Sequence, residues 1–254
     1  LHYPLRRQRQ MCIRDRNIRG LSLARGGKRV LEQIDMNIQP GRITAVLGPN
    51  GAGKSSLVMA IAGALPLLGG SVSLGEQSLT GLAAERIRRA GVAAVPEGHQ
   101  VFPGLSVLDN LKAAGNLLSS SEMDSALKEV FEVFPELAKC HAQPAQTLSG
   151  GQQQMVALGH ALMARPRFIL VDEMSLGLAP VIVKRLEGVI ELLARRGTGI
   201  LLIEQFTQVA LRLADYVYVM NQGRVALEGD AQRIKDDPQA LQRAYLAHSQ
   251  PDQP

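Results

Sequence analysis

Three glycines, a lysine and two serines stand close together in one short segment, Gly48-Pro49-Asn50-Gly51-Ala52-Gly53-Lys54-Ser55-Ser56. Glycines let backbone N–H groups turn inward around an anion, and a helix that starts directly behind them presents its positive N-terminus. In such a loop the lysine neutralises the β- and γ-phosphates of a nucleotide and the first serine hydroxyl ligates Mg²⁺. The apolar run 42–48 before the loop and the helical pattern after it favour a nucleotide site over a plain glycine-rich turn.

A nucleotide site of this kind needs a carboxylate on the metal side, and the segment FILVDE (168–173) supplies one. Its apolar residues predict a buried strand, and open α/β sheets place their ligands at the carboxyl ends of such strands. We therefore expect Asp172 to hold the metal ion and Glu173 to polarise the attacking water. Without the glycine-rich loop, the same pattern would indicate only a strand that ends in a solvated turn.

A second glycine pair opens a helix about a hundred residues later, in the segment LSGGQ. Ser149 can cap that helix, while Gly150 and Gly151 leave its first N–H groups bare, which makes another anion-binding helix end. From these residues and Gln152 alone, an ordinary capped helix is the better interpretation.

Length and composition limit the class of protein. The chain has 254 residues, 46% of them hydrophobic and only 4% aromatic, which is typical of an aliphatic α/β domain. No uncharged apolar run is long enough to cross a bilayer, so we expect a soluble chain that would act on a membrane only from its surface. Cys12 and Cys140 make no disulfide framework, and the five histidines show no metal-ligand spacing.

The net charge of +5 is concentrated at one end. Residues 1–16 hold five arginines and one aspartate, and the rest of the chain is close to neutral. A nucleic-acid-binding body should carry a basic face, so we expect no nucleic-acid partner. The segment 1–16 has no helical or strand period and is set aside as a non-native or disordered tail, with a native basic arm as the alternative.

Strand and helix patterns alternate through most of the remaining chain. We expect strands over 42–48, 92–97, 168–173 and 199–204, a hairpin or edge strand over 70–79, and a hairpin over 216–227. We expect helices over 106–118, 121–137, 152–164 and 180–196. This order predicts an α/β fold with a mainly parallel sheet, in which the helix-only stretch near 98–149 is an insertion.

The order and spacing of the motifs resemble the ATP-binding subunits of ABC transporters, from about Asn17 to past Gly229. The resemblance implies a P-loop NTPase (RecA-like) core at 17–97 and 150–254, an N-terminal antiparallel β part, and a helical subdomain at 98–149 that ends at the LSGGQ signature. It also implies that two such domains pair head to tail, so that each ATP lies between the P-loop of one copy and the Ser149–Gln152 segment of the other.

The same resemblance implies the partners. A homodimer or a related partner ATPase is required, with separate membrane permease subunits and, indirectly, a solute-binding protein, at the cytoplasmic face of a bacterial inner membrane. ATP and Mg²⁺ are the implied cofactors.

A finer resemblance is to the ATPase of bacterial branched-chain amino-acid importers. The segment VPEGHQVFPGLSVLDNL places Glu97 where most relatives have a glutamine that senses Mg²⁺ and the attacking water. SLGLAP puts Leu178 where others usually have aspartate, and LLIEQ puts Gln205 where most have the histidine that senses the γ-phosphate.

Two further positions depart from the family pattern. Arg25 stands where an aromatic residue usually stacks on adenine, and a guanidinium can also stack on a base. Met174 stands where proline usually follows the Asp-Glu pair, which implies a local change of backbone and packing.

The leading hypothesis is an ATP-hydrolysing subunit that drives import of branched-chain amino acids. The alternatives are the ATPase of a related importer for urea, another amide or a small solute, and a soluble ABC ATPase without a permease. A domain that only dimerises is disfavoured by Lys54, Ser55, Asp172 and Glu173.

Overall fold

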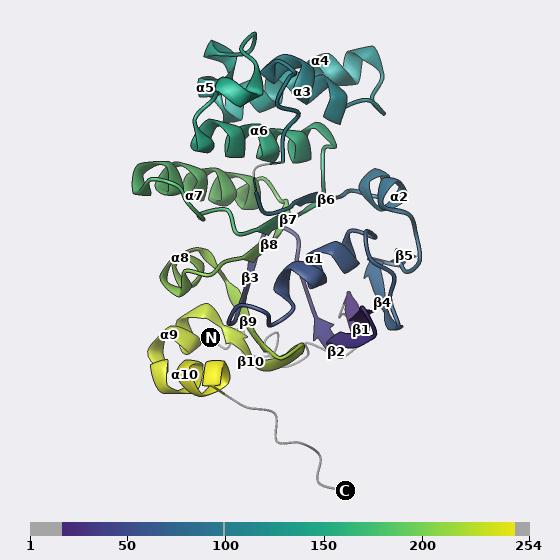
Figure 1. The fold of residues 1–254 in the computed structure, drawn as a ribbon, viewed down its shortest axis with the longest axis vertical. Helices are drawn as coiled ribbons and strands as arrows, with labels where there is room; N and C mark the ends of the chain where they lie inside the picture. The colour runs from purple at the N-terminus through teal and green to yellow at the C-terminus, as the bar shows by residue number, and fades with distance from the viewer. Residues whose placement is uncertain (1–16, 99, 247–254) are drawn as a thin grey trace, which may run out of the picture.

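The computed structural model describes residues 17–98 and 100–246, so the predicted tail at 1–16 lies outside it. The described chain confirms the predicted fold class, with a large and mainly parallel sheet, a smaller antiparallel sheet and helices against both (Figure 1). No helix within these ranges is both long and apolar enough to cross a membrane.

The large sheet has six strands in the order β10-β9-β3-β8-β7-β6. The strands are β3 (Ile43–Leu47), β6 (Val92–Val95), β7 (Phe168–Asp172), β8 (Gly199–Ile203), β9 (Tyr216–Asn221) and β10 (Arg224–Asp230). All neighbours run parallel except β10, which forms the predicted hairpin with β9. Every residue of β3, β7 and β8 is buried, as expected for a parallel sheet covered on both faces.

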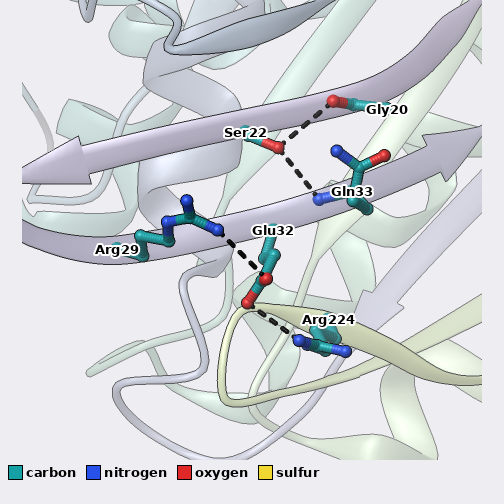
Figure 2. Close-up of polar contacts among 6 residues, drawn as sticks. All are labelled: Gly20, Ser22, Arg29, Glu32, Gln33 and Arg224. Atoms are coloured by element: carbon teal, nitrogen blue, oxygen red, sulfur yellow. Dashed lines mark hydrogen bonds and ion pairs between the residues drawn. The ribbon is translucent and has the colours of Figure 1, made fainter.

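The small sheet has the order β2-β1-β4-β5, formed by β1 (Ile18–Arg25), β2 (Lys28–Met36), β4 (Gly69–Leu74) and β5 (Gln77–Ser78). Its inner face, helix α1 (Lys54–Ile61) and one face of the large sheet share one hydrophobic core. The β1–β2 ladder shifts register near Ser22, opposite Gln33, whose φ is +51°. There the Ser22 hydroxyl accepts from the Gln33 N–H at 3.0 Å and donates to the Gly20 carbonyl at 3.2 Å, replacing ladder bonds (Figure 2).

Glu32 connects the two sheets. Figure 2 shows its carboxylate between Arg29 of the same strand, at 3.2 Å, and Arg224 of β10, at 3.0 Å. Its backbone N–H also donates to the Gly223 carbonyl at 2.8 Å. Exposed ion pairs stabilise little, so the backbone bond is the stronger tie between strand β2 and the turn of the β9–β10 hairpin.

The insertion between β6 and β7 is helical. Helices α3 (Val107–Ala114), α4 (Ser120–Val133) and α5 (Pro135–Lys139) gather over α6 (Gly150–Met163) at one end of the molecule (Figure 1), and α2 (Ala84–Arg89) precedes β6. Ser106 caps α3 by accepting from the Asp109 N–H at 3.0 Å. The domain boundaries at 97–98 and 149–150 stay a prediction.

The single helix predicted over 121–137 is wrong. Two helices meet at Phe134, which has φ −124° and ψ 74°, because Pro135 begins α5 and disfavours helical geometry in the residue before it. Phe134 instead fills the core of the insertion with no exposed surface.

The remaining helices are α7 (Pro180–Arg195), α8 (Thr207–Leu213), α9 (Ala231–Asp236) and α10 (Pro238–Leu246). α7 and α6 cover one face of the large sheet through a core shared with the insertion, whereas α8, α9 and α10 pack beside β3 and β9. His160 is half-buried on α6, and burial, with the charge of Arg88, lowers its pKa to about 4.

Gly70 offers a test of the small sheet. It has φ +88°, and a Cβ there would overlap the β1 backbone at Gly20 and lie 2.6 Å from the Arg19 carbonyl oxygen. We expect Gly70→Ala to lower the free energy of unfolding by about 3 kcal/mol, through overpacking added to left-handed backbone strain. Gly75→Ala is the matched control, because φ is +60° there but no atom lies within 4 Å, and it should cost about 1 kcal/mol through backbone strain alone. Equal losses in urea unfolding would contradict the close approach of β4 to β1.

Candidate nucleotide site

The glycine-rich loop joins β3 to α1 through backbone that other residues could not adopt. Gly48 has φ +147° and would overlap the Met220 carbonyl if it had a Cβ; Gly53, with φ +98°, would meet Leu31 and the Val30 carbonyl at 2.8 Å. α1 begins directly at Lys54, so its free N–H groups point toward the loop. The sequence thus builds a concave set of donors at the end of a buried strand.

Lys54 is only 5% exposed. Its Nζ donates to the carbonyls of Gly48, at 2.9 Å, and Pro49, at 3.1 Å. These bonds hold the ammonium group inside the loop, where it can neutralise an anion bound by the N–H groups.

An open pocket of about 700 Å³ lies over this loop. It brings together most of the residues predicted for the nucleotide, metal and catalytic roles, from segments far apart in the sequence. Its lining is formed by Arg25, Val30, Asn50, Gly51, Gly53, Lys54, Ser55, Ser56, Glu97, Glu173, Leu176 and Gln205. Two lining residues were not predicted from the sequence: Val30, in strand β2, and Leu176, in the turn after β7. Apolar residues at such places carry no chemical signal.

Asp172 lies beneath the pocket floor, 3% exposed at the carboxyl end of β7. Burial raises its pKa to about 6; a hydrogen bond with Ser55 opposes this shift, and the charges of Glu173 and Glu97 add to it. Its Oδ1 is buried and has no hydrogen-bond partner among the described residues. A buried carboxylate oxygen without a partner, beside a serine hydroxyl, is a suitable donor pair for a hard cation such as Mg²⁺.

No group of three or more His, Cys, Asp or Glu side chains that could hold a metal gathers within residues 17–98 and 100–246. A cation at Asp172 and Ser55 would therefore take its remaining ligands from phosphate oxygens and water, which is how Mg²⁺ is usually bound beside nucleotides.

Glu173 reaches the pocket from an unusual backbone. Its φ is +51°, which is uncommon for a residue other than glycine, and its N–H donates to the Ile203 carbonyl of β8 at 2.9 Å. Gln205, two residues beyond β8, donates from Nε2 to Asn50 Oδ1 at 3.2 Å. The candidate base and the candidate phosphate sensor therefore face the same loop.

Arg25 ends β1 and enters the same pocket beside Val30. Its strand turns back into β2, and Glu32 of β2 is bonded to the β9–β10 hairpin (Figure 2). A guanidinium at this edge can stack on a base, whereas Val30 supplies an apolar surface.

Met174 is the other residue that departs from the family pattern. It is fully buried in the core shared with α6 and α7.

Glu204 is a buried acid that sequence reasoning did not select. It is 1% exposed, and its carboxylate accepts from Ser175 Oγ at 2.5 Å and from the Ser175 N–H at 3.2 Å. The available signal was a charged residue at the end of a continuous apolar strand, directly before Gln205.

The signature residues do not line this pocket. Ser149 caps α6 in a reciprocal arrangement: its Oγ accepts from the Gln152 N–H at 3.3 Å, and Gln152 Oε1 accepts from the Ser149 N–H at 3.0 Å. A Cβ on Gly151 would lie 2.6 Å from Ile182 of α7, so glycine allows α6 to pack closely against α7. Ser149 and Gly150 are exposed at a capped helix N-terminus, a place suited to an anion from outside this pocket.

Comparison with known proteins identifies the family. The family described as ABC transporter matches residues 31–175. The chain is 38% identical over 221 residues to "High-affinity branched-chain amino acid transport ATP-binding protein BraG" of Pseudomonas aeruginosa, which covers 87% of this chain and 94% of that protein. It is 34% identical over 206 residues to "Probable branched-chain amino acid transport ATP-binding protein LivF" of Archaeoglobus fulgidus, covering 81% and 87%.

A solved structure of a nucleotide-free ATP-binding cassette from an ABC transporter has a TM-score of 0.81 to this chain, at 25% identity, covering 91% of this chain and 98% of that one. The resemblance inferred from the motifs is confirmed, and so is the P-loop NTPase fold that it implied. The chain belongs to the ABC transporter family as an ATP-binding subunit whose ATP hydrolysis is coupled to transport.

Proposed function

We propose that this chain energises an importer of branched-chain amino acids. The observation that carries the proposal is the 38% identity to BraG along 94% of that protein, with the candidate catalytic residues gathered in one pocket. Within the family, the permease and solute-binding protein select the solute, so a related amide or small-solute importer is the alternative. In the proposed assembly the chain lies at the cytoplasmic face of a bacterial inner membrane, against separate permease subunits.

The substrate is tested by reconstituting this chain in proteoliposomes with candidate permease and solute-binding proteins. We expect leucine, isoleucine or valine, loaded on the binding protein, to stimulate ATP hydrolysis several-fold, and urea to give no stimulation. Stimulation by urea alone would replace the amino acid with the amide as substrate.

Separate groups of residues in the pocket bind the phosphates of ATP and the metal ion. The loop from Gly48 to Gly53, with Ala52 inside it, and the N-terminus of α1 hold the phosphates, and Lys54 neutralises charge on the β- and γ-phosphates. Ser55 and Asp172 would hold Mg²⁺, with Glu97 on the same side of the pocket. When bound, the ion screens the phosphate charge that develops during hydrolysis.

Glu173 accepts a proton from the attacking water at the pocket edge. Gln205 donates an amide N–H to the γ-phosphate after leaving Asn50; it cannot carry charge, so it orients the phosphate without titrating. Arg25 contributes a stacking surface for the base.

A second copy, or a related ATPase, completes the site. Ser149, Gly150, Gly151 and Gln152 lie at a helix end outside their own chain's pocket. In the proposed head-to-tail dimer they contact the γ-phosphate held by the other copy, because a bare helix N-terminus favours an anion.

Glu173→Gln tests the base. We expect ATP affinity to stay within about twofold of the parent while turnover falls by about 10²-fold or more, because glutamine cannot accept the proton. The variant should also accumulate as an ATP-bound dimer in size-exclusion chromatography. Glu191→Gln is the control, since Glu191 pairs with exposed Arg195 on α7 and should leave turnover unchanged. Turnover of Glu173→Gln at the parent rate would show that Glu173 is not the base.

Ser149→Arg tests the role of the signature in the other copy's site. Nucleotide binding by the isolated chain should stay within about twofold, whereas turnover should fall by more than about tenfold, because a bulky side chain crowds the partner's γ-phosphate. Ser121→Arg, in the exposed first turn of α4, is the matched control and should retain turnover. Undiminished ATP hydrolysis by Ser149→Arg would exclude this contact.

A further inference from the structure

Glu204 occupies the junction of three segments that form the pocket. It follows the last residue of β8, and its backbone N–H points to the Val46 carbonyl of β3 at 3.4 Å. Its side chain accepts two hydrogen bonds from Ser175, one from the hydroxyl and one from the backbone N–H. One residue thus touches the strand that enters the phosphate loop and the turn that leaves β7.

Burying this carboxylate is unfavourable for folding. Within the described ranges it forms no ion pair with a lysine, arginine or histidine, and burial raises its pKa to about 7. Ser175 opposes this shift, whereas the charges of Glu173, in the turn after β7, and Glu187, on α7, add to it; Arg212 of α8 pairs with Glu187 instead. A leucine of similar volume would avoid the cost, so stability alone does not account for an acid at this position.

The hydrogen bonds to Ser175 act on the backbone that carries Glu173. Between Asp172 and Ser175 the chain leaves the sheet through the left-handed geometry of Glu173, which needs support from its surroundings. Hydrogen bonds to the end of β8 hold this backbone at two points, Glu173 itself and Ser175. The first joins the Glu173 N–H to the Ile203 carbonyl, and the second joins Ser175 to Glu204.

We propose that Glu204 is a positioning residue, which through Ser175 holds the turn after β7 so that Glu173 points into the nucleotide pocket. This inference rests on the proposed role of Glu173 in ATP hydrolysis. Glu204 does not line the pocket, so it acts on the reaction only through the backbone that it fixes.

The link does not depend on the charge of Glu204. When ionised, the carboxylate accepts both hydrogen bonds from Ser175; when protonated, it accepts from the N–H and donates to the hydroxyl. Glutamine can reproduce the second arrangement, accepting through Oε1 and donating through Nε2. Leucine can reproduce neither.

Glu204→Leu and Glu204→Gln therefore separate positioning from packing. For Glu204→Leu we expect turnover at saturating ATP to fall by about 10- to 100-fold, because a small displacement of a catalytic group is enough for such a loss. ATP affinity should stay within about twofold, since the phosphate loop keeps its own contacts. Glu204→Gln should keep turnover within about threefold of the parent.

Ser175→Ala is the second variant, in case Glu204→Leu does not fold. It removes the hydroxyl donor but leaves the backbone N–H, so turnover should fall less than in Glu204→Leu, with ATP affinity again unchanged. Parent-level turnover in Ser175→Ala or in a folded Glu204→Leu would overturn the proposal, as would equal losses in Glu204→Leu and Glu204→Gln. Glu173→Gln in the same assay reports separately on the base itself.

The pH dependence of stability reports the charge of Glu204 directly. Because its pKa is higher in the folded chain than in the unfolded chain, the folded state loses stability as pH rises from about 4.5 to 7. Glu204→Gln cannot ionise at this position. The melting temperature of the variant should therefore rise relative to that of the parent as pH increases from 5 to 8. A constant difference across this range would show that Glu204 is already charged at pH 5 and would overturn its assignment as an uncompensated buried acid.

Discussion

The register of three parallel strands is the constraint on which the site depends. Ile203, the last residue of β8, is the Cα partner of Val46 in β3 on one side and of Asp172 in β7 on the other. The three strands therefore end level with one another, although they come from distant parts of the sequence. Because all three are packed on both faces, a slip of one residue would move every side chain into the core of the opposite face and also separate Gly48, Asp172 and Glu204.

This alignment gathers negative charge at one edge of the sheet. Glu97 and Glu173 line the pocket, Asp172 lies beneath it, and Glu204 is buried behind the turn after β7. Lys54 is the buried cation of the group, and its ammonium is already bound to loop carbonyls. The charges of Glu173 and Glu97 disfavour ionisation of Asp172, and the charge of Glu173 also disfavours ionisation of Glu204, so gathering these acids has an electrostatic cost. A bound cation would relieve that cost and, by binding only the folded chain, would stabilise it.

Local sequence rules predict the phosphate loop and most strands because each depends on neighbouring residues. The loop needs glycine at positions of positive φ, such as Gly53, and a helix that begins at Lys54, and both requirements are visible in the sequence. The break at Phe134 could also have been predicted, since Pro135 restricts the residue before it, but the amphipathic pattern extends across it and conceals it.

The contact between Ser175 and Glu204 could not be predicted in the same way. It joins residues 29 apart through the register of two strands, and a hydrogen bond of that kind has no local sequence pattern. The same limit applies to the tie between Glu32 and Arg224, which depends on how the two sheets meet (Figure 2). Residues that bind a ligand directly are constrained in type and are therefore recognisable, whereas residues that hold them in place are constrained mainly by geometry. In this chain Glu204 stands directly beside Gln205, so the two kinds of constraint act on adjacent residues. The family motif identifies Gln205 as a functional residue, but it gives no indication of the role of Glu204.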